Sequence, residues 1–220
     1  MVDSLGAIGS SRDRVVSQCL LEAGESTQVP SAFSRDGTQL AYFQADGDPQ
    51  IWSVPIEPDS GGLKAGKPER FLTTKYIDLD GSFSPDGRWL AYASNESGRF
   101  EVYVRAFAAS GSAGGERRLI SNSGGLSPAW SPNGRELLYR AGDQIMTVGY
   151  TVSGDSFVAE RPRVWAANVR GAGGFDLAAD GKRVAMFVPL ATKDASPREN
   201  TVAVVLNFFD ELRQRVPTGQ

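Results

Sequence analysis

Two pairs of carboxylates are the side chains in this sequence with the clearest capacity for chemistry. Asp46 and Asp48 lie in the stretch ADGDP, and Asp78 and Asp80 lie in the stretch IDLDG. Paired carboxylates can act as a general acid and base, or as ligands for a hard cation. Calcium needs about six to eight oxygen ligands, which neither stretch supplies. We therefore interpret both stretches as solvated loops, and the sequence predicts no metal and no cofactor.

The residue types needed for other common chemistries are absent or scarce. Histidine is absent, which excludes the Ser-His-Asp and Cys-His catalytic groups and the HExxH zinc motif. Cys19 is the one cysteine, so no intrachain disulfide can form. A free cysteine usually behaves as a small buried apolar residue. Neither the HRD, VAIK and DFG motifs of kinases nor the GxSxG motif of hydrolases occurs. We therefore predict that this chain is not an enzyme.

The composition favours a folded domain with an apolar core. The 220 residues are 40% hydrophobic and 22% charged, with four tryptophans and a net charge of −3. The chain has no basic block that would suit a nucleic acid, and no apolar run reaches the roughly 18 residues of a membrane helix. The sequence therefore predicts neither a nucleic-acid partner nor direct insertion into a membrane.

One short motif recurs four times and predicts how the chain is organised. An Asp-Gly or Asn-Gly dipeptide separates apolar stretches in FSRDGTQLAY, FSPDGRWLAY, WSPNGRELLY and LAADGKRVAM, at spacings of 50, 47 and 47 residues. Such a dipeptide between strands is a strong hairpin signal, because both of its residues tolerate the positive φ that a tight turn requires. The predicted turn residues are Asp36, Gly37, Asp86, Gly87, Asn133, Gly134, Asp180 and Gly181.

Further short strands follow each turn. The strands directly after the turns are expected at 39–44, 89–94, 136–141 and 183–188. Third strands are expected at 50–56, 101–107, 144–151 and 201–208, and fourth strands at 69–74, 116–121 and 163–168. Apolar residues occupy both faces of these strands, which suits sheets that are buried on both sides. Four-stranded units of about 40–50 residues that cover one another describe the blades of a β-propeller.

We therefore predict an all-β fold, a β-propeller of four-stranded antiparallel blades with four visible repeats and a short C-terminal helix. A β-sandwich is the alternative, but it does not call for a 47-residue repeat. Phe33, Phe83 and Trp130, which precede the turns, are expected to fill the spaces between blades. Whether four blades close alone, form part of a ring, or are completed by a second chain is left open by the sequence.

The predicted divisions follow the repeats. An N-terminal segment, 1–27, includes a strand of a preceding blade, and the propeller repeats occupy 28–206. The blades are expected near 28–75, 76–122, 123–170 and 171–206, followed by a helix and tail at 207–220. Asn207 can cap this helix and Pro217 can end it.

Propeller topology predicts where a ligand would bind. The Asp-Gly and Asn-Gly turns lie on one face of the disc, here called the turn face. Connections between second and third strands, and between blades, lie on the other face, here called the loop face. Because loops on a rigid scaffold carry function, we expect a ligand pocket on the loop face. The candidate residues are Tyr76, Asp78, Asp80, Asn95, Glu96, Arg99 and Arg170.

The repeats resemble those of TolB-like propellers, also called PD40 or WD40-like repeats. FSPDGRWLAYASNESGRFEVYV and PAWSPNGRELLYR carry this likeness, which extends over most of the chain. The same repeat occurs in TolB and in the propellers of prolyl-oligopeptidase-type enzymes. The final stretch, VAVVLNFFDELRQRVPTG, resembles the end of large bacterial membrane proteins in which a eukaryotic-like serine/threonine kinase domain precedes the propeller. Propellers of this family usually have more blades than the four repeats counted here.

The resemblance implies a non-catalytic module that senses a ligand or binds a protein, as the extracytoplasmic part of a larger signalling protein such as a receptor-type serine/threonine kinase. The alternative is the accessory propeller of a prolyl-oligopeptidase-type (S9) peptidase without its hydrolase domain, which the kinase-type ending disfavours. The expected partners are a protein or small molecule at the loop face, and a second copy that completes the ring. The expected location is the periplasm, whereas the chain would be cytoplasmic if it is complete, because it has no targeting signal.

Overall fold

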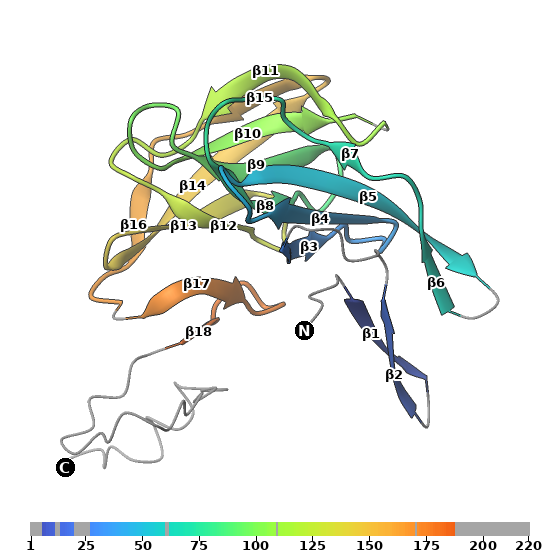
Figure 1. Cartoon of the computed structure of the whole chain (residues 1–220). Coiled ribbons are helices and arrows are strands. Elements are labelled where there is room, and N and C mark those ends of the chain that lie inside the picture. The colour runs from blue at the N-terminus through green and yellow to red at the C-terminus, as the bar shows by residue number, and fades with distance from the viewer. Residues whose placement is uncertain are drawn as a thin grey trace, which may run out of the picture.

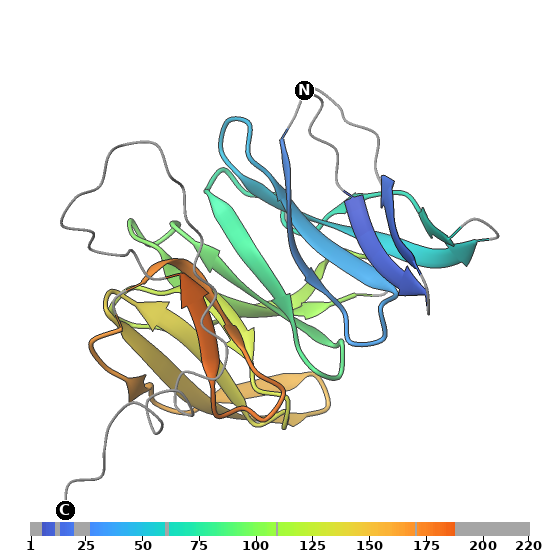
Figure 2. The same ribbon diagram turned by 90° about the horizontal axis from the view of Figure 1, so that it is seen from below.

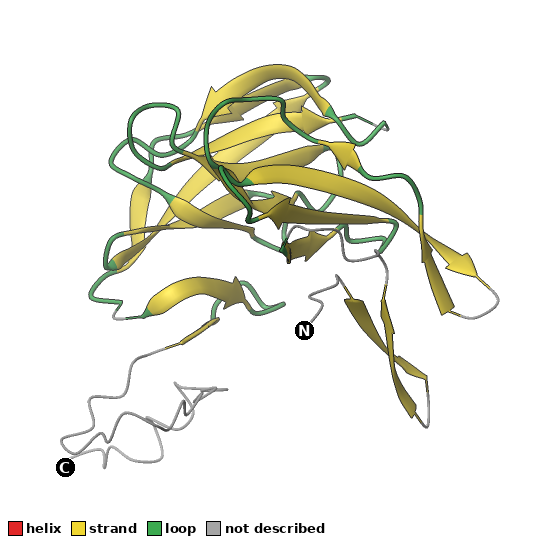
Figure 3. Cartoon of the chain, viewed as in Figure 1, coloured by secondary structure: helices red, strands yellow, loops and turns green. Residues whose placement is uncertain are grey.

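The fold consists entirely of β-strands in the part of the chain that the computed structural model describes, which comprises residues 6–11, 14–19, 27–59, 62–108, 110–169 and 171–187 (Figure 3). No helix in this part is long and apolar enough to cross a membrane. The predicted strand at 201–208 and the predicted helix at 207–220 lie outside the described residues.

The strands form antiparallel sheets that follow the four repeats, and we call these sheets blades 1 to 4 (Figure 1). Blade 1 contains β3 (Gln28–Phe33), β4 (Gln39–Gln44), β5 (Gln50–Asp59), β6 (Gly62–Ala65) and β7 (Glu69–Arg70). Blade 2 contains β8 (Asp78–Phe83), β9 (Trp89–Ser94), β10 (Glu101–Phe107) and β11 (Ala113–Leu119). Blade 3 contains β12 (Leu126–Trp130), β13 (Glu136–Ala141), β14 (Gln144–Ser153), β15 (Ser156–Ala159) and β16 (Arg163–Ala166). The described strands of blade 4 are β17 (Ala172–Leu177) and β18 (Val184–Phe187).

The blades are arranged as in a propeller. The first strand of each blade is the inner one, and neighbouring blades contact each other through these strands, since β3 contacts β8, β8 contacts β12, and β12 contacts β17. Figure 2 shows the sheets following one another in chain order in a fan. A further hairpin of β1 (Gly6–Ser11) and β2 (Arg14–Cys19) lies beside blade 1. The predicted β-propeller is confirmed.

Alternate residues of β9 in blade 2 bury against the two neighbouring blades, because side chains alternate across a strand. Leu90 and Tyr92 of β9 pack with Phe83 and with Ile51 of blade 1. The intervening residue, Ala91, packs on the other side, within a cluster whose other members include residues of blade 3. This two-sided burial explains why the strands are apolar at successive positions.

Two of the three aromatic residues before the turns fill the spaces between blades, and the third does not. Phe83 is 7% exposed and Trp130 is 8% exposed, whereas Phe33 is 48% exposed. Phe83 packs toward blade 1 and Trp130 toward blade 2. The equivalent side of blade 1 is the one away from blade 2, where the described residues place no complete blade. The prediction for Phe33 was therefore wrong.

The four turns form hairpins at the predicted residues, but their geometry differs from the expected one. Gly37, Gly87, Gly134 and Gly181 have φ between 66° and 73°, whereas the residue before each glycine does not have a positive φ. The aspartate instead accepts hydrogen bonds: Asp86 Oδ1 accepts from Ser84 Oγ at 2.5 Å and from the Arg88 N–H at 3.1 Å. Its role is to cap the turn, as Asp and Asn commonly do.

The outer strands differ from the expected ones. The predicted fourth strand at 69–74 is only the two-residue β7, and β5 continues past its predicted end and pairs with β6. Blade 3 repeats this arrangement, since β14 pairs with both β15 and β16. In blade 2 a single strand, β11, pairs with β10 across a β-bulge.

Candidate functional site

A central cavity of about 270 Å³ opens on the turn face. The inner strands of all four blades contribute to its wall, together with the turns of the first three blades. The apolar lining residues are Phe33, Phe83, Pro85, Ala129, Trp130, Pro132 and Leu177. The polar lining residues are Arg35, Ser82, Ser84 and Asp176. This site is therefore built from equivalent positions of the repeat.

The aromatic wall of the central cavity is held by a hydrogen bond between blades and by ring contacts within blades. Trp130 Nε1 donates a hydrogen bond of 2.9 Å to the carbonyl oxygen of Ser82. The Trp130 ring meets Tyr150 edge-on at 5.0 Å between centroids, and Phe83 meets Phe107 in the same way at 4.9 Å. These contacts leave a preformed apolar surface, to which Phe33 adds a half-exposed ring.

Charged side chains of both signs are exposed at the central cavity. Arg35 lies in the turn of blade 1, and Asp176 lies on β17 of blade 4. The hydroxyl of Ser84 is already used, because it donates to Asp86 and accepts from the Trp89 N–H. An apolar centre with a polar, charged rim is the usual arrangement of a protein-binding surface.

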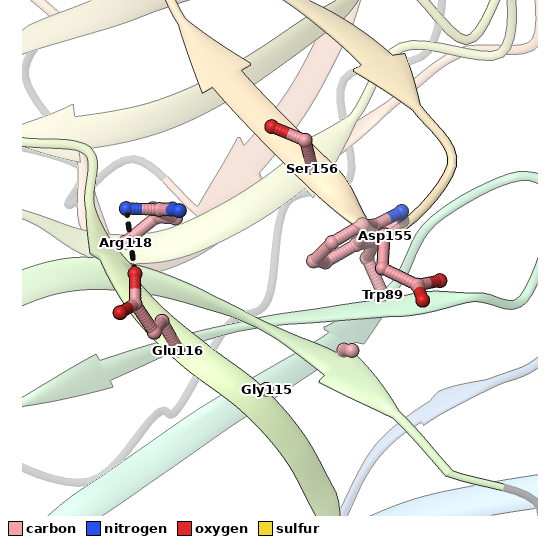
Figure 4. A pocket seen from close by; sticks show the side chains of 7 residues that line it. Trp89, Gly115, Glu116, Arg118, Asp155 and Ser156 are labelled. Carbon is pink, nitrogen blue, oxygen red and sulfur yellow. Dashed lines mark ion pairs between the residues drawn. The ribbon is translucent and has the colours of Figure 1, made fainter.

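A second cavity of about 510 Å³, which we call the peripheral cleft, lies between blades 2 and 3. Figure 4 shows Glu116 and Arg118 of β11 on one side of it, and Asp155 and Ser156 on the other. Its remaining lining residues are Trp89, Ala106 and Gly115. Arg88, in the turn of blade 2, donates a hydrogen bond of 2.6 Å to the carbonyl oxygen of Gly154, which places this cleft near the turn face as well.

Neither cavity lies on the loop face, so neither bears on the predicted loop-face site. The candidate residues of that site mostly make contacts that hold the structure together. Asp78 is fully buried as the first residue of β8, so the interpretation of IDLDG as a solvated loop was wrong. Thr74 Oγ1 donates a hydrogen bond to Asp78 Oδ2. Burial raises the pKa of Asp78, hydrogen bonds from Ser94 and Thr74 oppose that rise, and nearby Glu96 adds to it.

Asp80 joins two blades. Its Oδ2 accepts hydrogen bonds from the Ser127 N–H at 3.1 Å and from Ser127 Oγ at 3.2 Å. The two residues occupy equivalent positions in β8 and β12, both at β-bulges, and both have a positive φ. Burial raises the pKa of Asp80, and the two hydrogen bonds from Ser127 act in the opposite direction.

The other candidates of the loop face are placed as follows. Asn95 Oδ1 accepts from the Ile77 N–H at 2.9 Å, which holds the connection between blades 1 and 2 against that between β9 and β10. Glu96 forms an ion pair with Arg117. The Tyr76 carbonyl accepts from Gln50 Nε2 at 2.5 Å. Arg170 lies outside the described residues.

Arg99 forms an ion pair with Glu101, a carboxylate that was not among the candidates chosen from the sequence. The Nε atom of Arg99 lies 2.6 Å from Oε1 of Glu101, a residue that is only 3% exposed. Glu101 also accepts hydrogen bonds from Ser121 Oγ and from the Gly124 N–H. Asp78, Asp80, Asn95, Glu96 and Arg99 thus all take part in contacts that hold loops or blades together, and the loop-face site stays a prediction.

The residues of the central cavity were also missed as site residues. Phe33, Arg35 and Pro85 lie within or beside the repeated turn motif, which we had interpreted only as structure. The signal available in the sequence was that these positions recur at the same end of every inner strand. Among the described residues, no group of three or more side chains of metal-binding type could hold a metal ion.

Comparison with known proteins shows the fold of the chain. No family model and no curated protein matches the sequence. A structure assigned as TolB from Agrobacterium tumefaciens matches with a TM-score of 0.51 and 18% identity, over 79% of this chain and 62% of that one. A structure of the nidogen/laminin complex matches with a TM-score of 0.58 and 15% identity, over 85% and 67% of the two chains. A structure assigned as a 6-phosphogluconolactonase from Bacteroides uniformis matches with a TM-score of 0.50 and 17% identity, over 76% and 50%.

These likenesses and the stacked blades define a β-propeller. The fold is TolB-like, in agreement with the resemblance of the repeats. The chain spans 62% of the length of the Agrobacterium tumefaciens chain that it matches.

Proposed function

We propose that this chain is a non-catalytic protein-interaction module that binds its partner at the central cavity of the turn face. The observation that carries the proposal is the composition of that cavity. The inner strands of four blades, with the turn of blade 1, bring the half-exposed ring of Phe33 and the exposed charges of Arg35 and Asp176 to one place, beside the nearly buried Phe83 and Trp130. Aromatic side chains that become buried on binding, with a polar rim around them, supply much of the binding energy in protein interfaces.

Two further observations support binding rather than catalysis. One of the similar structures is that of a protein complex, nidogen with laminin. The Bacteroides uniformis structure is assigned as a lactonase, but the present chain has no histidine to act as a general base. No turnover of lactone or peptide substrates is therefore expected.

The parent protein is proposed from the resemblance of the C-terminal stretch. Residues 202–219 resemble the end of bacterial receptor-type serine/threonine kinases, so the module would be the extracytoplasmic, ligand-sensing part of a signalling protein. A kinase domain and a membrane helix encoded in frame upstream would support this assignment.

Self-association is a second mode of protein binding that we propose for the chain. The described blades form an arc, and Phe187 on the last described strand of blade 4 is 55% exposed. A second copy that packs against this strand would bury its ring.

The binding proposal is tested by capture of partners from the cells that produce this protein. The full chain, Phe33→Asp, Arg35→Glu and Lys64→Glu serve as baits, where Lys64 is an exposed residue of β6 outside the cavity. We expect the wild type and Lys64→Glu to retain the same partner, and the two cavity variants to lose it. Retention of that partner by all four baits would contradict the proposal.

A further inference from the structure

The peripheral cleft lies between two strands that have an unpaired edge in the described part of the chain. β11 is the last strand of blade 2 and pairs there only with β10. β15 pairs there only with β14. Figure 1 shows both strands at the same outer side of the molecule, and Figure 4 shows residues of both around the cleft. An exposed strand edge is a template for pairing with another extended chain.

The register of β11 shows which main-chain groups are free to pair. The Ile120 N–H donates to the Val102 carbonyl, and Arg118 is opposite Val104. Since the direction of main-chain groups alternates along an antiparallel strand, the N–H and C=O groups of Leu119 point away from β10, as does the C=O of Arg117, which borders the β-bulge. They face the side on which an added strand would lie.

The two arginines of this edge, Arg117 and Arg118, differ in how firmly their side chains are held by neighbouring groups. Arg117 is engaged by the ion pair with Glu96 and by the ring of Tyr103, which lies 5.1 Å from its guanidinium carbon. Arg118 lines the cleft, and its ion pair with Glu116 at 3.1 Å is exposed, with side chains 44% and 80% accessible. Exposed pairs contribute little to stability, so a ligand carboxylate can replace that of Glu116 at low cost.

The floor of the cleft is formed by a buried tryptophan and two small residues. Trp89 is 3% exposed and packs against Phe157 at 5.2 Å between ring centroids. Ala106 and Gly115 add no bulk, and a methyl group at Gly115 would reach only ordinary contact distance from Ala106. Side chains of an added strand that point into the cleft therefore have room above an aromatic surface.

From this geometry we infer that the peripheral cleft is a second binding site, which takes an extended peptide segment as an added strand on β11, with an acidic side chain opposite Arg118. The inference rests on the proposal that the chain binds proteins, but it concerns a different surface from the central cavity. Main-chain hydrogen bonds to Arg117 and Leu119 supply affinity, and Arg118 selects the charge.

The test uses the peptide acetyl-Thr-Val-Glu-Val-Thr-amide and its counterpart with Lys in place of Glu. Both are titrated into the full chain, and the amide signals of Arg117 and Leu119 are followed by NMR. We expect the Glu peptide to shift these signals and to bind more tightly than the Lys peptide. Arg118→Glu is expected to weaken the Glu peptide about five- to tenfold and to reverse the preference. Lys64→Glu, with the same change in net charge, should leave both affinities unchanged.

A second variant separates strand addition from simple charge attraction. Leu119→Pro removes an N–H that points away from β10, and proline is tolerated at such an edge position. This variant should keep the folded circular dichroism spectrum and lose the peptide. Binding of the Glu peptide to Leu119→Pro would overturn the inference, and so would binding that does not depend on the sign of the charge at residue 118. A change in the solution mass of a variant without any peptide binding would also overturn it. Phe33→Asp, which changes the central cavity, should bind the Glu peptide as the wild type does. Failure of the central cavity proposal can therefore be distinguished from failure of the inference on the peripheral cleft.

Discussion

Trp130 shows at the scale of one residue how a side chain joins two blades. Its ring is 8% exposed, contacts Tyr150 and Phe157, and donates to the Ser82 carbonyl of the neighbouring blade. Trp130→Ala is expected to lower the free energy of unfolding by about 3–5 kcal/mol, because it leaves a cavity and an unpaired carbonyl. Leu177, the equivalent residue of blade 4, is half-buried, and Leu177→Ala should cost about 1–2 kcal/mol. Urea unfolding measures both, and equal costs would contradict this assignment.

Asp78 is the residue from which a pH dependence of stability follows. Burial raises the pKa of its carboxyl in the folded state above that in the unfolded chain. The folded protein therefore binds this proton more tightly, so the contribution of Asp78 to stability is full below the unfolded-state pKa and is lost as the pH rises through the folded-state pKa. Asp78→Asn, which cannot ionise, should therefore lose less stability than the wild type as the pH rises above about 4.

Asp36 provides the matched control for that experiment. Hydrogen bonds from Ser34 and Thr38 lower the pKa of its carboxyl, so its contribution is present above the unfolded-state pKa and is lost as the pH falls. Asp36→Asn should therefore change the pH profile of the urea midpoint in the opposite direction. If the pH profiles of the urea midpoint for Asp78→Asn and Asp36→Asn both run parallel to that of the wild type, the pKa shifts of the two carboxyls are not as described.

The turn is the element on which each blade depends, and Gly87 tests it. Its φ is 69°, and a methyl group there would meet no atom within 4 Å. Gly87→Ala is therefore expected to destabilise the fold by about 1–2 kcal/mol through backbone strain alone, and Gly87→Asn by less, since Asn tolerates this conformation. Gly114→Ala, at a β11 position without positive φ, should be close to neutral. If urea unfolding gives the same cost for Ala and Asn at position 87, the turn geometry is not the cause.

Among the strands, the sequence correctly predicted the bounds of those that are defined by a local sequence pattern. The bounds of β4, β9, β10 and β13 coincide with the predicted strands, because short apolar stretches and the turn motif define them locally. The length of β5 could not be predicted, since its pairing with β6 depends on a hairpin beyond its apolar stretch. The exposure of Phe33 depends on which blade precedes it, and this information is not in the repeat. The central cavity arises where four distant segments meet, which no single motif reveals.

The described blades form an arc, and the state of association is a property of the whole molecule. We expect a solution mass twice the 23.6 kDa of one chain, because a second copy would cover the exposed ring of Phe187 in blade 4. Phe187→Asp should shift the mass measured by light scattering toward that of one chain. A mass of 23.6 kDa for the wild type at every concentration would refute self-association.

Binding of a partner at the turn face can be examined by photo-crosslinking from both faces of the propeller. A photoreactive residue is placed at Arg35 or Asp176 on the turn face, and at Tyr76 or Asn95 on the loop face, in cells that produce the full protein. We expect a discrete protein adduct from the two turn-face positions and none from the loop-face positions. An adduct formed only from Tyr76 or Asn95 would contradict binding at the turn face.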